Sequence, residues 1–312
     1  MAERAWRRAR IKRDTFHGEG MSESAPRAII FRGPMRGSSR FRGENLDGRE
    51  GGCMSGTRDW DPGLYLKFED ERTQPAIDLV NRIRIGDPRR IVDIGCGPGN
   101  STRVLARRWP NANLTGVDDS PSMLEQARAG DTGGKWILAD ARAYDPDARF
   151  DIVFSNAALQ WMPGHETLIP RLFGMTADGG ALAVQLPAFN RMPLGIAIRK
   201  IASLPEWREK TAGCEAMLTC LDYAEYYTIL ARLSARVELW ETRYIHVMDT
   251  HESIIEWSRG TGMRPFLDRM DGADERARFE RAVRIELEKD YPAMENGRIL
   301  FPFFRFFFIA YR

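Results

Sequence analysis

The 312-residue sequence contains few cysteines and no long apolar run. Its most apolar stretch, Phe301–Tyr311, is interrupted by Arg305 and is well short of the roughly 18 residues that span a bilayer. The cysteines are too sparse for a disulfide framework and form no paired CxxC half-sites for zinc. They are Cys53, Cys96, Cys214 and Cys220. We therefore expect a cytoplasmic protein with no transmembrane segment, no membrane partner and no metal site.

A strong charge excess is also missing from most of the chain. Residues 1–53 carry 12 Lys and Arg against 7 Asp and Glu, a net charge of +5, whereas residues 54–312 carry 34 against 37, a net charge of −3. Duplex binding relies on several cation–phosphate contacts, so no nucleic-acid partner is expected.

Residues 1–53 are rich in Arg and Gly, and they show no helical or strand periodicity. They have neither the apolar core of a secretory signal nor the acid-poor composition of a transit peptide. We expect a disordered basic leader, with Met54 as the actual start of translation; a functional basic arm is the alternative.

After Met54, strand and helix patterns alternate, with Ser120 and Pro121 predicted to cap one helix. This order predicts an α/β, Rossmann-like, doubly wound, mainly parallel seven-stranded sheet. We assign residues 54–250 to its core, 251–290 to a helical lid insertion and 291–312 to a closing strand, and expect a monomer. The expected helices are 73–85, 101–108, 121–128 and 166–175, and the expected strands are 90–94, 113–117, 135–138, 151–155, 180–185, 237–244 and 305–310.

A glycine loop follows the first expected strand, in the segment DIGCGPGN at 93–100. Glycines allow a sharp turn and a close approach of backbone to ligand. The dinucleotide fingerprint GxGxxG would need Gly where Asn100 stands, and no GxxxxGK[ST] phosphate loop is present.

Polar side chains follow at the ends of successive expected strands. Asp93, Asp118, Asp140 and Asn156 are separated by 25, 22 and 16 residues. An isolated Asp at a strand end is usually a turn former, but in an open α/β sheet four such ends line one crevice. The pattern predicts a ligand site there.

Together these motifs resemble those of class I S-adenosylmethionine-dependent methyltransferases. The resemblance implies that Gly95, Gly97 and Gly99 let the backbone run close to the methionyl part of S-adenosylmethionine. Asp93 would help to orient that part. The resemblance also implies that Asp118 binds the ribose hydroxyls, while Asp140 and the backbone of Ala141 hold the adenine. Asn156 belongs to the fourth-strand motif. Asn100 contributes to the loop or caps the next helix.

Nucleic-acid amino methyltransferases carry an Asn/Asp-Pro-Pro-aromatic motif where this chain has SNAALQW at 155–161, so a small substrate is favoured. Several segments are similar to bacterial trans-aconitate 2-methyltransferases: RDWDPGLYLKF at 58–68, AVQLP at 183–187, GTGMRP at 260–265 and the stretch 291–297. That family forms a monomethyl ester of an anionic polycarboxylate. A carboxylic acid of pKa near 4 is ionised at neutral pH, so no general base is required.

An anionic substrate needs local cations and hydrogen-bond donors, and Arg suits carboxylates best. Our first candidate is Arg264 in the expected lid. The others are Tyr226, Tyr244, His246 and, near the methyl site, Trp161, with Tyr65 and Phe68 closing over the cofactor; each could instead be structural. Two rival functions are a C- or O-methyltransferase of quinone or related small-molecule biosynthesis and a non-catalytic cofactor-binding protein on the same fold.

Overall fold

The computed structural model describes residues 69–130 and 133–312. The predicted leader, Met54, Tyr65 and Phe68 lie outside the described residues. Within the described ranges, no helix combines the length and the apolar character needed to cross a membrane.

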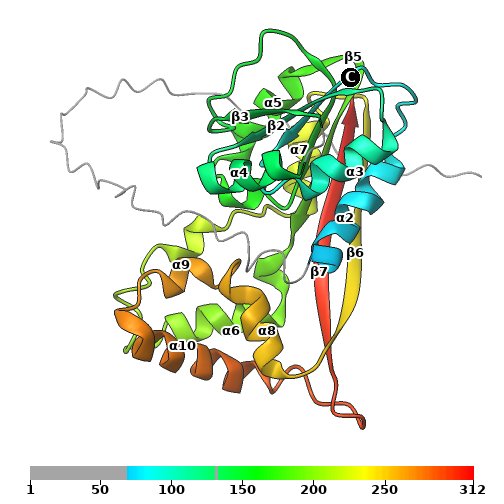
Figure 1. Ribbon diagram of the computed structural model, residues 1–312. Helices are drawn as coiled ribbons and strands as arrows, with labels where there is room; N and C mark the ends of the chain where they lie inside the picture. Colours follow the sequence, from blue (N-terminus) through cyan, green and yellow to red (C-terminus); the bar gives the residue numbers. More distant parts are fainter. Residues whose placement is uncertain (1–68, 131–132) are drawn as a thin grey trace, which may run out of the picture. The chain divides into compact units, whose positions relative to one another are not determined.

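The core of the fold is a seven-stranded sheet in the order β3-β2-β1-β4-β5-β7-β6 (Figure 1). The first five strands in this order are parallel, and β7 runs antiparallel to both β5 and β6. The predicted fold class is therefore confirmed. The strands are β1 (Arg90–Ile94), β2 (Asn113–Asp118), β3 (Lys135–Leu138), β4 (Phe150–Asn156), β5 (Thr176–Pro187), β6 (Arg236–Met248) and β7 (Ile299–Tyr311).

Helices cover both faces of this sheet. On one face α2 (Glu69–Arg82) and α3 (Asn100–Arg108) pack on a core that includes Phe307, and on the other α5 (His165–Gly174) and α7 (Tyr223–Leu230) pack on Phe306 and Phe308. Successive side chains of a strand point to opposite faces, so β7 is apolar from Phe306 to Ala310, where both faces are buried.

Local sequence explains several boundaries. Helix α4 (Pro121–Ala129) begins as predicted, with Ser120 Oγ accepting a hydrogen bond from the amide of Met123 at 3.3 Å. Helix α2 begins at Glu69 instead of Thr73, so Pro75 lies inside the helix. Helices α6 (Pro193–Ala202) and α7 were not predicted.

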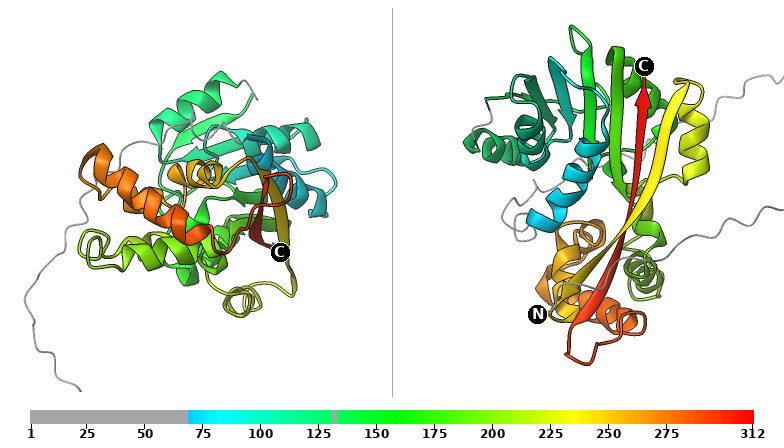
Figure 2. Two further views of the ribbon diagram at one scale, coloured as in Figure 1. Left: turned by 90° about the horizontal axis from the view of Figure 1, so that it is seen from below. Right: turned by 90° about the vertical axis from the view of Figure 1, so that its right-hand side faces the viewer.

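A second helical layer lies beyond the carboxyl ends of the parallel strands. Helices α8 (His251–Arg259), α9 (Arg264–Leu267) and α10 (Gly272–Leu287) share a core with α6. The layer thus also contains residues from before β6, outside the predicted insertion 251–290. Figures 1 and 2 show the long strands β6 and β7 extending from the sheet to this layer. The division into core, lid and closing strand stays a prediction.

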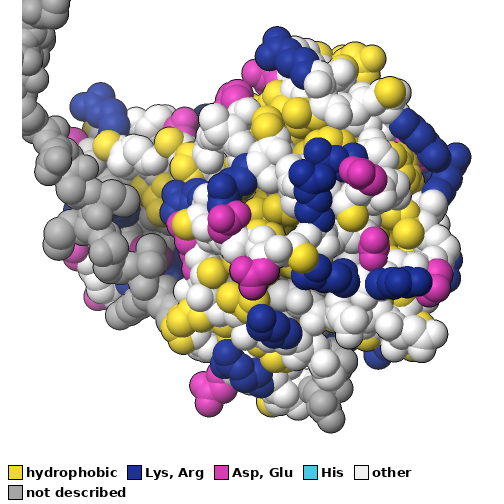
Figure 3. Space-filling view, turned by 90° about the horizontal axis from the view of Figure 1, so that it is seen from above, with side chains coloured by type: hydrophobic (Ala, Val, Ile, Leu, Met, Phe, Trp, Pro, Cys, Tyr) yellow, Lys and Arg dark blue, Asp and Glu magenta, His cyan; other side chains and the backbone are white. Residues whose placement is uncertain are grey.

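The opposite end of the molecule, seen in Figure 3, shows Lys and Arg side chains scattered among acidic and apolar ones.

Candidate functional site

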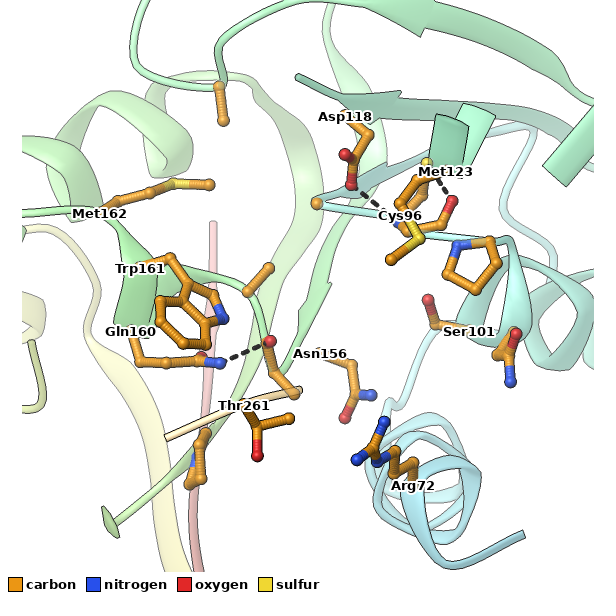
Figure 4. A pocket seen from close by; sticks show the side chains of 18 of the residues that line it. Arg72, Cys96, Ser101, Asp118, Met123, Asn156, Gln160, Trp161, Met162 and Thr261 are labelled. Carbon is orange, nitrogen blue, oxygen red and sulfur yellow. Dashed lines mark hydrogen bonds between the residues drawn. The ribbon is translucent and has the colours of Figure 1, made fainter. Parts of the chain in front are cut away.

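A pocket opens where the parallel strands meet the helical layer (Figure 4). One wall, here called the cofactor side, consists of lining residues from the glycine loop and from the segments that follow β2 and β3. The facing wall, called the acceptor side, consists of lining residues from α2, β7, the 3₁₀ segment η1 (Leu159–Trp161) and the segments 187–189 and 257–262. Of the predicted site residues, those on the lining are Gly95, Gly97, Asn100, Asp118, Asp140, Ala141, Asn156 and Trp161.

The glycine loop connects β1 to α3 through positive backbone angles. Gly95, Gly97 and Gly99 have φ of 67°, 54° and 84°, which L side chains rarely adopt. A Cβ at Gly95 would lie 2.2 Å from Cβ of Ala158, whereas one at Gly97 would meet nothing within 4 Å. The loop is therefore packed at its start and open to the pocket at its centre.

Asp93 lies beneath this loop and does not line the pocket. Its Oδ2 accepts hydrogen bonds of 2.6 Å from the hydroxyls of Ser101 and Thr102. Oδ1 is buried without a hydrogen-bond partner among the described residues. Burial raises the pKa of Asp93 to about 6, although the two hydroxyls act against that rise. Such a carboxylate can receive a cationic ligand group.

Asp118 holds the glycine loop against the end of β2. Its Oδ2 accepts from the amide of Gly97 at 2.8 Å and its Oδ1 from the amide of Ser120 at 3.0 Å. Asn100 is the first residue of α3, whose N-cap is Gly99, and its Oδ1 accepts from Arg103 at 2.8 Å. Asn100 therefore does not cap α3, and its expected contribution to the loop stays a prediction.

After β3, Asp140 forms an ion pair with Arg142 at 2.6 Å. The hydrogen bonds from the guanidinium lower the pKa of Asp140. Ala141 between them is buried and lines the pocket. Sequence reasoning did not single out Arg142.

The end of β4 turns sharply into the acceptor side. Asn156 is followed by Ala157, which has a positive φ of 54°. Nε2 of Gln160 donates to the carbonyl of Ala157 at 2.6 Å, and this fixes the turn that presents Trp161. Figure 4 shows Gln160 and Trp161 across the pocket from Asp118.

Tyr226 is not brought to the pocket. It is fully buried against Phe306 and Phe308 on one face of the sheet, and its hydroxyl bonds Nδ1 of His165 at 2.8 Å. Burial raises the pKa of Tyr226 far above its usual value. This side chain packs in the core, away from the pocket lining.

Tyr244 and His246 also lie off the lining. The hydroxyl of Tyr244 hydrogen-bonds Asp78 and so ties β6 to α2. The ring of His246 packs 4.9 Å from that of Trp257, which itself lines the pocket. Burial, with a contribution from the charge of Arg305, lowers the pKa of His246 to about 4, so its imidazole is neutral at pH 7.

Arg264 is likewise absent from the described lining. It begins α9 and lies 3.5 Å from Asp268 one helical turn later. The late helical segment instead contributes uncharged side chains to the lining, those of Trp257 and Thr261, with Gly262 beside them.

The cations of the acceptor side are Arg72 and Arg305, which sequence reasoning missed. Their exposed fractions are only 6% and 4%. Arg72 was omitted because the expected helix began one residue after it. Arg305 did carry a signal, since it interrupts an otherwise apolar strand.

The residues on the cofactor side suit S-adenosylmethionine. The open space at Gly97 admits a ligand against bare backbone. Asp93 lies beneath the loop with Oδ1 unpartnered among the described residues, and its negative charge would help to orient the ammonium of the methionyl part. Asp118 and Asp140 would hold the ribose and adenine. These individual roles stay proposals.

Comparisons with known proteins identify the class. Residues 91–180 match a family model described as a methyltransferase domain. The YcgJ protein of Bacillus subtilis shares the fold, with a TM-score of 0.51 at 13% identity over 77% of this chain and 98% of that one. The chain is an S-adenosylmethionine-dependent methyltransferase.

Curated relatives then give the family. A trans-aconitate 2-methyltransferase from Methylobacterium nodulans is 43% identical over 255 residues, covering 81% of this chain and 98% of the relative. One from Rhodopseudomonas palustris is 44% identical over 253 residues, with the same coverage of 81% and 98%. The chain belongs to the trans-aconitate 2-methyltransferase family, which confirms the resemblance noted in its sequence.

Proposed function

We propose that this methyltransferase forms a monomethyl ester of trans-aconitate or a close polycarboxylate. The observation that carries the proposal is a separation of charge within the pocket. The acidic lining residues Asp118, Asp119 and Asp140 lie at and after the ends of β2 and β3 on the cofactor side, where they outnumber the single cation Arg142, while Arg72 and Arg305 lie on the acceptor side. An anionic acceptor is attracted to the second wall and repelled by the first.

The acceptor chemistry agrees with the side chains present. The described lining residues of the acceptor side include no His, Lys, Tyr, Asp or Glu that could remove a proton from a phenol or amine. A carboxylic acid with a pKa of roughly 4 needs no such base, because it is already ionised. Bound S-adenosylmethionine supplies the methyl group: the carboxylate oxygen bonds to it as the carbon–sulfur bond breaks and its electron pair passes to sulfur.

The protein then contributes alignment and exclusion of water. Trp161, Met162, Trp257 and Phe303 give the acceptor side apolar walls between the polar groups. A desolvated carboxylate is a stronger nucleophile than a hydrated one, and in-line placement in favourable cases is equivalent to about 10⁵ M or more of reactant.

The test is transfer of label from S-adenosylmethionine to trans-aconitate, cis-aconitate, citrate, isocitrate and a quinol precursor. We expect a labelled monoester of trans-aconitate as the main product. Gly95→Ala serves as the inactive control, because an added Cβ there collides with Ala158 and disrupts the glycine loop. Transfer to the quinol and to none of the acids would instead establish the small-molecule C- or O-methyltransferase.

A further inference from the structure

Arg72 and Arg305 reach the pocket from distant parts of the chain. Arg72 lies on α2 and Arg305 on β7, and no other arginine among the described residues is as deeply buried. Charges in a pocket shielded from water interact more strongly than charges at the surface. Two guanidinium groups in one pocket wall therefore define a site for more than one anionic group.

Each guanidinium is held in a fixed direction. One terminal nitrogen of Arg305 donates to Oε1 of the buried Gln185 at 3.3 Å, and its guanidinium lies 4.6 Å from the centre of the Phe303 ring. Gln185 and Phe303 leave the guanidinium few rotamers, so little side-chain entropy is lost when it binds a ligand.

Arg72 is fixed by Trp257 of α8. It donates to the carbonyl of Trp257 at 3.2 Å and lies 5.3 Å from the centre of the indole. Figure 4 shows its guanidinium extending from α2 into the space beside Asn156. Trp257 also packs 5.7 Å from Phe303, so a continuous aromatic wall connects the two arginines.

We propose that Arg72 and Arg305 bind the two carboxylates of the substrate that are not methylated, and so select acids with three carboxylates over acids with two. This inference rests on the proposed function and adds the basis of its selectivity. With both carboxylates held, the third is directed to the part of the pocket between Trp161 and the cofactor side.

The arrangement predicts that each arginine recognises a different carboxylate. Trans-aconitate can be compared with two dicarboxylates that keep the carboxylate on C2: itaconate, which lacks the carboxylate on C1, and mesaconate, in which a methyl group replaces the carboxymethyl group. An arginine cannot contribute to binding an acid that lacks its carboxylate.

The experiment measures kcat/KM for the three acids with Arg72→Gln, Arg305→Gln and the surface control Arg278→Gln. Dissociation constants in the presence of S-adenosylhomocysteine are measured alongside. Each pocket variant should lose about 30-fold or more on trans-aconitate, and less than about 3-fold on one of the two dicarboxylates, a different one for each arginine. Affinity for S-adenosylhomocysteine and the behaviour of Arg278→Gln should not change.

An equal loss on all three acids would overturn the assignment, as would a loss confined to cofactor affinity. If Arg305→Gln does not fold, Arg305→Lys replaces it, because it keeps the charge but loses the fork that binds a carboxylate through two nitrogens. If the wild type binds trans-aconitate with this selectivity but does not methylate it, the proposed function fails and the two-arginine site stands.

Discussion

The hydroxyl of Tyr226 lies 2.8 Å from Nδ1 of His165, and both side chains are completely buried. Nε2 of the same histidine lies 2.9 Å from the carbonyl of Leu159. A carbonyl only accepts, so Nε2 carries the proton and Nδ1 accepts from the tyrosine. This chain of hydrogen bonds joins α7 through α5 to η1, which presents Gln160 and Trp161 to the pocket.

Tyr226→Phe should therefore lower the stability of the fold and disturb the position of Gln160 and Trp161 on the acceptor side. Nδ1 of His165 would be left buried without a donor, which lowers the free energy of unfolding by about 1–3 kcal/mol. The rate of methyl transfer should fall while affinity for S-adenosylhomocysteine is kept. Urea unfolding and steady-state kinetics measure the two effects. The control is Tyr227→Phe at a residue that is 54% exposed on the same helix. Equal stability of the two variants would refute the role assigned to Tyr226.

The sequence was sufficient to predict the cofactor side because that side follows from chain topology. Once strands and helices alternate, the carboxyl ends of parallel strands must meet at one edge, so Asp118, Asp140 and Asn156 converge without any knowledge of packing. Asp93 was predicted by the same rule, yet it lies under the loop because Ser101 and Thr102 of α3 draw its carboxylate inward.

The acceptor side could not be predicted in this way, because it is assembled by contacts between distant segments. Arg72 meets Trp257, which is 185 residues away in the sequence. Arg264 was favoured for its position in a helical segment, but a helix presents each residue to one direction only, and that direction depends on how α9 packs. The interruption of an apolar strand by Arg305 was the one local clue, since a strand buried on both faces rarely admits a charge without a function.

Gly95 and Gly133 allow a test of the packing of the glycine loop. Both have a φ of 67°, but a Cβ at Gly133 would meet nothing within 4 Å, whereas one at Gly95 would lie 2.2 Å from Ala158. Gly133→Ala should lower the free energy of unfolding by only about 1–2 kcal/mol, the cost of the left-handed backbone. Gly95→Ala should lower it further and abolish binding of S-adenosylhomocysteine in calorimetry. Normal binding by Gly95→Ala would show that the loop tolerates displacement.

Gly262 allows Phe189 to pack against the turn between α8 and α9. A Cβ at Gly262 would lie 2.2 Å from Cζ of the Phe189 ring. Gly262→Ala should displace this turn, which carries the lining residue Thr261, and raise KM for the acid several-fold without changing cofactor affinity. Gly86→Ala, where a Cβ meets nothing within 4 Å, is the control.

The shorter side chain of Phe189→Leu should relieve the collision. In a double-mutant cycle, the free energy of unfolding should then show a coupling of about 0.5–3 kcal/mol between positions 189 and 262. If the effects of the two substitutions are strictly additive, the effect of Gly262→Ala does not arise from contact with Phe189.

Asp93 should make the ligand-free enzyme less stable as the pH rises. Its pKa is about 6 in the folded protein against 3.8 for the ordinary carboxyl. Between these values the folded state keeps a proton that the unfolded state has released. The contribution of the Asp93 proton to the free energy of unfolding is therefore complete below the unfolded pKa and is lost as the pH rises through about 6.

Asp93→Asn removes this dependence, because the amide does not ionise. Between pH 5 and pH 8, the free energy of unfolding of the wild type should fall by about 1 kcal/mol more than that of the variant. Urea unfolding at a series of pH values measures the difference. The variant should also bind S-adenosylhomocysteine weakly, since it lacks the negative charge that is proposed to orient the methionyl part. Parallel pH profiles for the two proteins would mean that Asp93 is already ionised in the ligand-free fold, with its charge compensated by the hydroxyls of Ser101 and Thr102.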